Sequence, residues 1–450
     1  MASAVLVGAG EFGASFLYRS GRASGLRVLA AVDANVQRVI DVARRAGFAY
    51  DRIARCESTA EVHAAWTRGD FVAVADASLL IDRPFDVIVE ATGSPESAAR
   101  VALLAIGHGK HVALVTKECD SVVGNALQAR AAAAGLACTA VDGDQPSLAI
   151  KLVRWARMLG LDIVCAGKAG EYDFVWDEPA GTVAAIGTSV PAPWMTALWN
   201  GPGDGLIARV YARADECGAW PHRTVPDLCE LGIVANATGL VPDCASLHAP
   251  ICRTLELPDL MRPREEGGLF ARRGVVDMFN CLRRNDELSF AGGVFVVVHC
   301  DDSATWRVLR AKGIPTSQDG RHALLHNPVH LLGIEAPMTL FDLASTSRPV
   351  ANLSPVCDLH ARALRKLPAG TCLDLGPRHA IDGVEPLLAA ATPARTGMPI
   401  PYYMAAGSTL VTDVAAGEIL RRDHVAEPAD STLWRLRDEQ DARHFKTLRG

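Results

Sequence analysis

The first 33 residues constrain the fold more than any other part of the chain. An apolar run at residues 4–7 leads into Gly8-Ala9-Gly10-Glu11-Phe12-Gly13, and a second apolar run at residues 28–32 ends at Asp33. In a G-x-G-x-x-G loop the first glycine allows a tight turn, the second lets the backbone approach a pyrophosphate, and the third lets helix and strand pack closely. The following helix N-terminus attracts phosphates. The segment therefore predicts a Rossmann nucleotide-binding unit; the alternative is a glycine-rich turn in an unrelated α/β sheet.

The acid after the second apolar run bears on the choice of coenzyme. Asp33 follows Gly13 by twenty residues, where a carboxylate can bond the ribose 2′-hydroxyl of NAD. Asn35 and Arg38 are near enough to bind the 2′-phosphate of NADP if Asp33 turns away, so NAD and NADP both stay open. Asp33 could instead cap the next helix. The residues of this segment that we expect to bind the coenzyme are Gly8, Gly10, Glu11, Phe12, Gly13 and Asp33.

Composition excludes several other classes of protein. A chain of 450 residues is too long for one ordinary core, so two or three domains are expected. The net charge of −6 gives no reason to expect a nucleic acid or an anionic membrane as partner. No leader pattern opens the sequence, and no apolar run reaches the roughly 18–20 residues that span a bilayer. The twelve cysteines are scattered without a C-x-x-C pair, which favours reduced thiols in a cytoplasmic protein.

Short apolar runs alternate with helical patterns as far as residue 141. The expected strands are residues 71–75, 85–90, 111–115 and 137–141, and the expected helices are residues 36–46, 59–66, 96–106 and 121–134. This alternation is typical of a parallel sheet covered on both faces. The fold class expected is α/β, with a doubly wound Rossmann domain over residues 1–145.

The alternation stops after residue 145. A helix at residues 147–159 and strands at residues 162–168 and 293–298 stand among loop-rich segments, which favours an α+β catalytic domain over residues 146–345. Short β-like segments separated by glycine turns then predict a small third domain, residues 346–450, with a helical tail at residues 431–445. The leucines and the phenylalanine of this tail favour a homodimer; they are Leu433, Leu436 and Phe445.

Polar residues follow two of the expected strands. Thr92 and Gly93 come after the strand that ends at Glu90, and Thr116-Lys117 ends the next one. The carboxyl ends of such strands line the coenzyme crevice, so we expect Thr92, Gly93 and Thr116 to bind the coenzyme. Lys117 would polarise a substrate carbonyl or take a proton from an alcohol. The alternatives are an ordinary strand-to-helix turn and a surface lysine.

Two acids stand where the first domain meets the second, in the motif Asp142-Gly143-Asp144. Carboxylate oxygens at this spacing suit a divalent cation or can orient a substrate hydroxyl. Equally, Asp144 and Ser147 can cap the helix that follows. Asp144 is therefore a candidate metal ligand, and the capping alternative stays open.

Residues 167–173 hold the closest group of charged side chains in the second domain that could take part in a reaction. Lys168 stands between glycines and can reach a phosphate or a carbonyl without crowding. Glu171 and Asp173 alternate along an extended segment, which would place both carboxylates on one face for a metal ion or for acid–base work. The alternative is a solvated strand end.

A guanidinium and three imidazoles gather between residues 321 and 330. Arg321 and the histidines suit an anionic group, so the expected substrate is a small phosphorylated or carboxylated molecule. His330 is a candidate proton carrier.

Several motifs resemble known families. Residues 86–94, followed by Gly109-Lys110-His111-Val112 and Thr116-Lys117, resemble homoserine dehydrogenase. The second domain resembles the DXP reductoisomerase-like oxidoreductases, called DRL, through motifs at residues 142–146, 166–168, 234–239, 292–295 and 330–335. Residues 348–425 resemble a SAF domain, a small β-clip module.

The DRL resemblance implies an NADPH-dependent conversion of 1-deoxy-D-xylulose 5-phosphate into 2-C-methyl-D-erythritol 4-phosphate, as in isoprenoid precursor synthesis. The chemistry would be a skeletal rearrangement aided by Mg²⁺ or Mn²⁺, followed by hydride transfer. Asp144, Glu171 and Asp173 would hold the cation, and Lys168 with Arg321 would bind the phosphate.

Proton transfer would fall to His330 or Lys117. Ordinary reductoisomerases carry a G-S-T-G-S-I-G loop, where this chain has Gly8-Ala9-Gly10-Glu11-Phe12-Gly13. This difference leaves a dehydrogenase of another small polyol, sugar acid or hydroxy-aldehyde as the alternative. A further alternative is a protein that binds NAD(P) without turning anything over.

Overall fold

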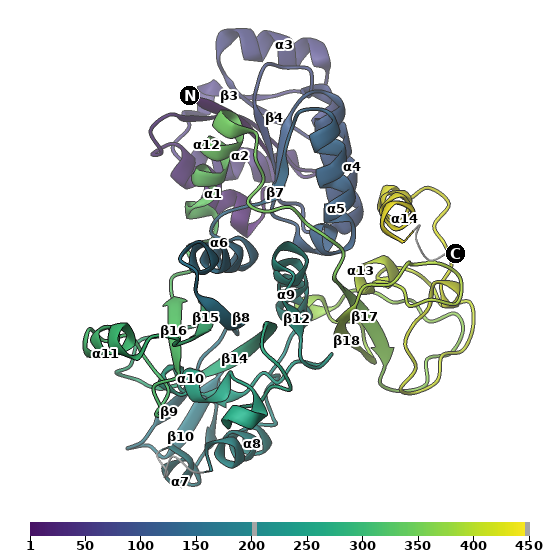
Figure 1. The fold of residues 1–450 in the computed structure, drawn as a ribbon. Coiled ribbons are helices and arrows are strands. Elements are labelled where there is room, and N and C mark those ends of the chain that lie inside the picture. Colours follow the sequence, from purple (N-terminus) through teal and green to yellow (C-terminus); the bar gives the residue numbers. More distant parts are fainter. Residues whose placement is uncertain (200–204, 446–450) are drawn as a thin grey trace.

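A computed structural model describes residues 1–199 and 205–445, which form three parts (Figure 1). The first part is a seven-stranded sheet in the order β3-β4-β2-β1-β5-β6-β7. Every neighbouring pair in it is parallel. Its elements are β1 (Ala2–Val7), α1 (Glu11–Ser20), β2 (Leu26–Val32), α2 (Val36–Arg45), β3 (Ile53–Arg55), α3 (Thr59–Arg68), β4 (Phe71–Val74), β5 (Val87–Glu90), α4 (Pro95–Gly107), β6 (His111–Leu114), α5 (Lys117–Ala133) and β7 (Cys138–Ala140).

Apolar side chains cover both faces of this sheet, as the near-continuous apolar strands require. Phe16 of α1 and Val39 of α2 pack on one face. Val62 of α3, Ala102 of α4 and Val123 of α5 pack on the other. The expected doubly wound α/β fold is confirmed. The short edge strand β3 was not expected from the sequence, and α5 begins at Lys117, four residues before the expected start.

The second part is a mixed sheet in the order β11-β10-β9-β14-β8-β15-β16, with β12 (Val241–Pro242) and β13 (Ile251–Cys252) paired to β14. Helices α6 (Gln145–Met158) and α9 (Val225–Thr238) lie between this sheet and the first part (Figure 1). The strands of the path are β8 (Asp162–Ala169), β9 (Phe174–Asp177), β10 (Thr182–Ala185), β11 (Thr188–Pro191), β14 (Val275–Arg284), β15 (Val294–His299) and β16 (His322–Asn327). Shorter helices at its margin are α7 (Met195–Trp199), α8 (Leu206–Glu216), α10 (Leu257–Leu260) and α11 (Ser303–Ala311).

The chain returns to the first sheet after β16. Helix α12 (Ala336–Thr346) buries Leu340 and Leu343 in the same core as Leu6 and Phe16. Residues 336–346 therefore pack with the first domain, although the sequence pattern assigned most of them to the second. The reason is that their apolar face fits the sheet left open beside α1.

The third part is built on an antiparallel pair, β17 (Cys357–Ala363) and β18 (Val384–Ala390). Isolated bridges such as Arg362 to Ile419 and Leu367 to Val414 join the remaining segments to it, in line with the short β-like pieces expected. The Asn236 side chain of α9 bonds the backbone of Val356 and Cys357, which fixes this part against the second.

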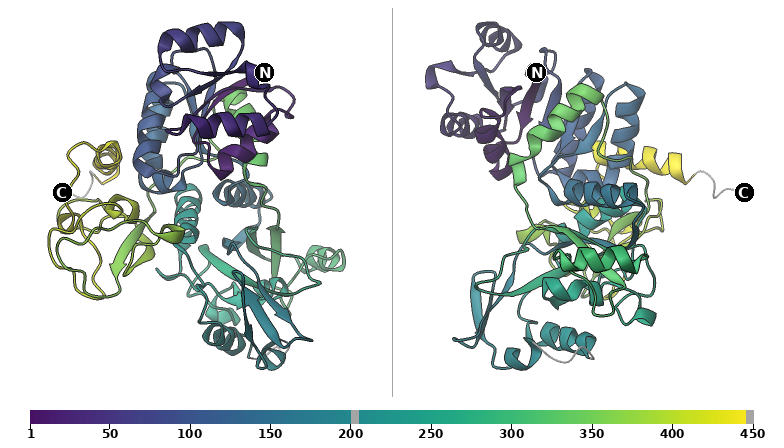
Figure 2. Two further views of the ribbon diagram at one scale, coloured as in Figure 1. Left: turned by 180° about the vertical axis from the view of Figure 1, so that it is seen from behind. Right: turned by 60° about the vertical axis from the view of Figure 1, so that its left-hand side comes forward.

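The C-terminal helix α14 (Thr432–His444) leaves the third part and packs on α4 and α5 (Figure 2). Its Arg437 is fully buried and bonds Asp358, Asp441 and the carbonyl of Val122, so three regions of the chain meet at one guanidinium. Leu433 and Leu436 are buried inside the chain here, so these two leucines cannot serve the homodimer interface for which they were considered. Among the described helices, none is long and apolar enough to cross a bilayer.

Candidate active site

The glycine loop between β1 and α1 has the geometry that a dinucleotide needs. Gly8 has a φ of +100°, and a Cβ there would lie 2.2 Å from the carbonyl oxygen of Ala91. A Cβ on Gly13 would lie 2.1 Å from the oxygen of Gly8. Around Gly10, by contrast, a Cβ would meet no atom within 4 Å. Packing therefore requires Gly8 and Gly13, whereas Gly10 leaves the backbone open at the helix N-terminus, where phosphates bind.

A cavity of about 850 Å³ runs along this loop. Gly8, Gly10, Asp33 and Thr92 line it from the first sheet, and Thr432 and Arg435 line it from α14. Glu11 is exposed in the first turn of α1, and Phe12 packs partly into the core. The loop would therefore hold phosphates through its backbone rather than through these two side chains.

Asp33 is fixed at the end of β2 by backbone donors. Its Oδ2 accepts from the N–H of Ala9 at 3.0 Å, and its Oδ1 accepts from the N–H of Asn35 at 2.9 Å. Arg38 Nη1 lies 3.5 Å from Asp33 Oδ2. The side chain that caps α2 is Asn35, not Asp33, so the carboxylate faces the cavity as a ribose ligand would.

A buried carboxyl that the sequence analysis passed over holds the next strand ends together. Glu90 Oε1 accepts from both the N–H and the hydroxyl of Thr92, at 2.8 and 2.6 Å. The Thr116 hydroxyl accepts from the N–H of Gly93 at 3.0 Å. Burial raises the pKa of Glu90. Thr92, Gly93 and Thr116 thus lie together at the carboxyl edge of the sheet, as their strand positions predict.

Two lysines meet at one glutamate in the centre of the molecule. Lys117 begins α5 and bonds Glu230 of α9, and Lys168 of β8 bonds the other oxygen of Glu230. Burial favours the neutral acid, but Lys117 and Lys168 outweigh it and hold the pKa of Glu230 at about 2. Burial would lower the lysine pKa values, yet the surrounding carboxylates raise both above the ordinary range. Both lysines are therefore ammonium ions at neutral pH.

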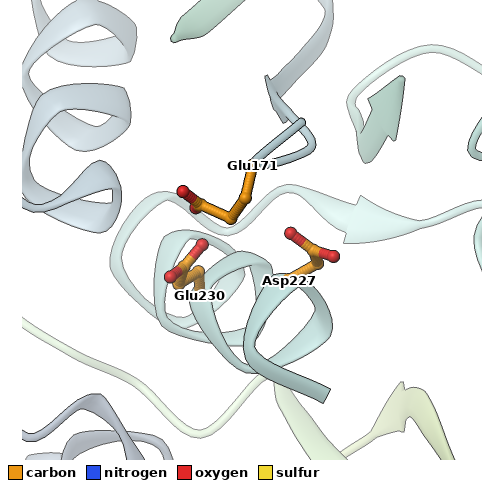
Figure 3. A group of neighbouring side chains, drawn as sticks. All are labelled: Glu171, Asp227 and Glu230. Atoms are coloured by element: carbon orange, nitrogen blue, oxygen red, sulfur yellow. The ribbon is translucent and has the colours of Figure 1, made fainter. Parts of the chain in front are cut away.

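Lys168 also lies close to two further carboxylates, Asp227 and Glu171, which Figure 3 shows together with Glu230. Its Nζ lies 2.7 Å from Asp227 Oδ1 and 3.4 Å from Glu171 Oε1. Glu171, Asp227 and Glu230 each offer an oxygen, and these atoms lie within 4.8 Å of one another. Such a set of hard oxygen donors suits Mg²⁺ or Mn²⁺. Within the described residues, the ammonium groups of Lys117 and Lys168 lie near four carboxyl groups, those of Asp144, Glu171, Asp227 and Glu230. Carboxyl groups thus outnumber ammonium groups here, which favours binding of a cation.

Asp144 lies at the margin of this centre. Its Oδ1 accepts from the N–H of Gln145 at 3.0 Å, which is the predicted cap of α6, and lies 3.9 Å from Lys117 Nζ. Burial raises the pKa of Asp144, and Lys117 opposes that effect. Burial and the Asp144 charge raise the pKa of Asp120, one turn into α5, to about 7. The Ser147 hydroxyl bonds Asp142 rather than capping α6.

The side chains of His330 and Gln145 both lie against Gly292, and three of their polar atoms lack a hydrogen-bond partner among the described residues. A Cβ on Gly292 would lie 2.5 Å from His330 Nδ1 and 3.2 Å from Gln145 Nε2. Within the described chain, His330 Nε2 and both amide atoms of Gln145 are buried without a hydrogen-bond partner. Buried polar atoms are seldom left without a hydrogen-bond partner, so the side chains of His330 and Gln145 are suited to bind a polar ligand.

The structure separates two other candidates from this centre. Asp173 Oδ2 accepts from Arg283 Nε at 2.6 Å, and the carboxylates grouped around Lys168 in the described chain are Glu171, Asp227 and Glu230. Arg321 precedes β16 and pairs with Asp319 at 2.9 Å. The antiparallel register sets His322 opposite His299, at the end of β15 remote from Val294 and Lys168. The predicted roles of Asp173 as metal ligand and Arg321 as phosphate ligand therefore do not fit their positions.

Sequence reasoning missed Asp227 and Glu230, which complete the centre. Both stand on α9, whose other side chains are mostly apolar, and they follow Thr224, whose hydroxyl bonds Asp227 in a capping box. Acids three residues apart share a helix face. Two acids at that spacing in an otherwise apolar helix were the available signal.

The parallel sheet with its open glycine loop has the architecture of a nucleotide-binding Rossmann domain, and the lysine–carboxylate centre lies beside it. Residues 226–336 match the family described as "Oxidoreductase DRL, catalytic domain". The matched segment runs from the start of α9, with Asp227 and Glu230, to the start of α12. It includes three of the motifs on which the DRL resemblance depends, and it does not reach residues 348–425.

Similar solved structures include an oxidoreductase from Agrobacterium radiobacter in complex with NAD⁺, L-tartaric acid and magnesium, at 16% identity and a TM-score of 0.29. That alignment covers 40% of this chain and 46% of that one. Biliverdin reductase from Synechocystis sp. PCC 6803, in complex with biliverdin and NADP⁺, aligns at 16% identity over 39% of this chain and 48% of that one, with a TM-score of 0.25. This chain thus spans less than half the length of either protein. No curated protein matches the chain.

Proposed function

We propose that this chain is an NAD(P)H-dependent oxidoreductase that reduces a carbonyl group of a small anionic molecule. The observation that carries the proposal is the bonding of Lys117 and Lys168 to one buried carboxylate, Glu230. Lys117 also directly follows Thr116, whose hydroxyl binds the loop that borders the proposed nicotinamide site. A reducing coenzyme and a fixed pair of ammonium groups would therefore share one edge of the sheet.

The protonation state of the lysines favours reduction over oxidation in the free enzyme. The carboxylates raise the pKa of Lys117 and of Lys168, so both side chains donate hydrogen bonds and neither is poised as a base. In the forward direction, hydride from the nicotinamide would add to the carbonyl carbon. The oxygen would take a proton from an ammonium group, and water would return that proton.

The first candidate substrate is 1-deoxy-D-xylulose 5-phosphate, which would be rearranged and then reduced with NADPH. Two observations support it: the DRL catalytic-domain match over residues 226–336 and the oxygen donors of Glu171, Asp227 and Glu230. These three carboxylates, rather than the predicted set of Asp144, Glu171 and Asp173, would hold the divalent cation. A bound cation would polarise the substrate oxygens.

A second candidate is a simpler dehydrogenase reaction on another polyol, sugar acid or hydroxy-aldehyde. The glycine loop favours it, because Gly8, Gly10 and Gly13 have the geometry of an ordinary dinucleotide-binding turn. His330 and Gln145 would then bind a substrate hydroxyl or carboxylate through their unpaired atoms.

The two candidates are separated by one assay. Purified protein is mixed with NADPH or NADH, Mn²⁺ and deoxyxylulose phosphate, and coenzyme oxidation is followed at 340 nm in a standard absorbance assay, with product identified by mass and NMR. Coenzyme oxidation with a branched product supports the first candidate. Oxidation without rearrangement, or only with hydroxy-aldehydes, supports the second. Failure to bind either coenzyme would overturn both.

A further inference from the structure

One turn of the third part contacts residues next to the lysine–carboxylate centre. Residues 376–380 lie between β17 and β18 and pack beside α9. Within this turn Arg378 has φ 53° and ψ 33°, and His379 has φ 58°. Two successive non-glycine residues in the left-handed region are sterically unfavourable. Glycine or asparagine would relieve that cost, so the two large side chains mark a candidate functional position.

Both side chains point toward residues that flank the centre. His379 Nδ1 lies 2.9 Å from Oε1 of Glu118, the neighbour of Lys117. Arg378 Cζ lies 5.7 Å from the ring centroid of Tyr172, the neighbour of Glu171. The turn therefore contacts the neighbour of Lys117 through one side chain and the neighbour of Glu171 through the other.

A buried tyrosine of the third part lies behind this turn. The Tyr403 ring centroid is 6.2 Å from that of His379, and its side chain is buried. Within the described residues its hydroxyl has no hydrogen-bond partner, although the charges of Glu118 and Glu230 act on it. Buried hydroxyls are seldom left unpaired, so Tyr403 offers a further polar atom behind this turn.

Arg378 is also free to bind an anion. It is exposed, and in the described part of the chain it takes part in no ion pair. Its guanidinium can bind an oxyanion with two parallel hydrogen bonds. Arg321, the arginine that sequence reasoning assigned to this task, lies at the remote end of β16.

We propose that Arg378, held over Tyr172 by the left-handed turn, binds the anionic group of the substrate, a phosphate or a carboxylate. This inference rests on the proposed function, because it names the group that the substrate presents beside the lysine–carboxylate centre. The third part is then a specificity element of the active site, with His379 as a positioning residue that anchors the turn to Glu118.

The test measures anion binding in the absence of coenzyme, so that it does not depend on nicotinamide chemistry. Full-length protein is titrated with inorganic phosphate and with malonate, and the Kd is obtained from the shift in Tm. Arg378→Gln is compared with the wild type. The matched control is Arg395→Gln, because Arg395 is an exposed arginine of the same part with no ion pair among the described residues.

We expect the Arg378→Gln variant to bind at least one of the two anions at least tenfold more weakly, with Arg395→Gln unchanged. Loss of phosphate binding alone would indicate a phosphorylated substrate, and loss of malonate binding alone a carboxylated one. Anion binding that is equal in all three proteins would overturn the proposal, since an anion held only by the glycine loop would ignore Arg378. Absence of binding in the wild type would overturn it as well. The proposed function fails separately, through lack of NADH and NADPH binding.

Discussion

The glycine loop and the lysine–carboxylate centre lie at the same edge of the first sheet but are built in opposite ways. The loop uses backbone atoms from one continuous segment, and its specificity comes from the space around Gly8, Gly10 and Gly13. The centre uses charged side chains from α5, β8 and α9, which are more than a hundred residues apart at the extremes. One region depends on the absence of side chains, and the other depends on side chains that cannot be buried without partners.

This difference determines how each region responds to change. A loop held by van der Waals contact fails when an atom is added. A buried charge cluster fails when one partner is removed, because the remaining charges lose their compensation. Each of the following predictions tests one side of this comparison.

The largest effect is expected from Lys168→Met. Removing the ammonium group leaves Asp227 and Glu230 buried next to each other, so we expect a loss of about 3–5 kcal/mol in the free energy of unfolding. If Lys168 donates to the substrate oxygen as proposed, the same change removes that donor, and kcat should fall by about a thousandfold. Denaturant unfolding and steady-state kinetics measure the two effects.

Lys366→Met is the control for this variant. Lys366 pairs with Asp413 outside the centre, and both side chains are exposed. Its unfolding free energy should change by less than about 1 kcal/mol. If Lys168→Met were as stable as this control, the centre would not depend on charge compensation.

The free energy of unfolding should depend on pH through Asp120. Its folded-state pKa of about 7 lies above the ordinary value of 3.8. The folded state thus favours the protonated acid, and the stability that Asp120 contributes is lost as the pH rises from about 4 to about 7. Asp120→Asn should remove this decline and make the protein more stable than the wild type at pH 8, by a few kcal/mol at most. A parallel pH dependence of unfolding in both proteins would contradict the raised pKa.

The glycine loop should show a contrast between two neighbouring substitutions. Gly13→Ala pushes a Cβ against the oxygen of Gly8 and should destabilise the protein by about 2 kcal/mol. Gly10→Ala meets no atom within 4 Å, so it should fold normally while weakening NADH binding. Tm and fluorescence titration separate the two outcomes. Equal effects of both substitutions on Tm would show that Gly10 is also held by packing.

The smallest effect concerns the choice of coenzyme. Asp33 lines the cavity at the end of β2, where the proposed coenzyme would place its ribose, and Arg38 Nη1 lies 3.5 Å from its Oδ2. We expect Asp33→Ser to shift the ratio of NADH to NADPH affinity toward NADPH by about tenfold, or about 1.4 kcal/mol. Asp41→Ser on the exposed side of α2 is the control. An unchanged ratio would mean that the ribose does not contact Asp33.

Much of the first domain could be predicted from the sequence because its signals are local. Apolar runs, the glycine spacing and caps such as Ser94 with Pro95 each act within a few residues. Lys117 and Lys168, which the structure brings together at Glu230, could also be selected from the sequence, because each stands at a strand or helix end next to a recognisable motif.

The rest of the site depends on contacts that sequence spacing does not encode. Glu230 meets Lys117 only because α9 packs on α5. Asp173 looked equivalent to Glu171, but the turn after β8 directs it to Arg283 instead. Helices α12 and α14 likewise pack against the first part through apolar side chains that are far apart in the sequence from the residues they contact.

One wall of the cavity along the glycine loop comes from Thr432 and Arg435, more than four hundred residues after Gly8 and Gly10. During synthesis, a ribosome-bound chain therefore carries an unfinished pocket long after its Rossmann strands have emerged. The complete cavity therefore exists only after α14 has packed on α4 and α5, because this helix is the last element of the chain to be made.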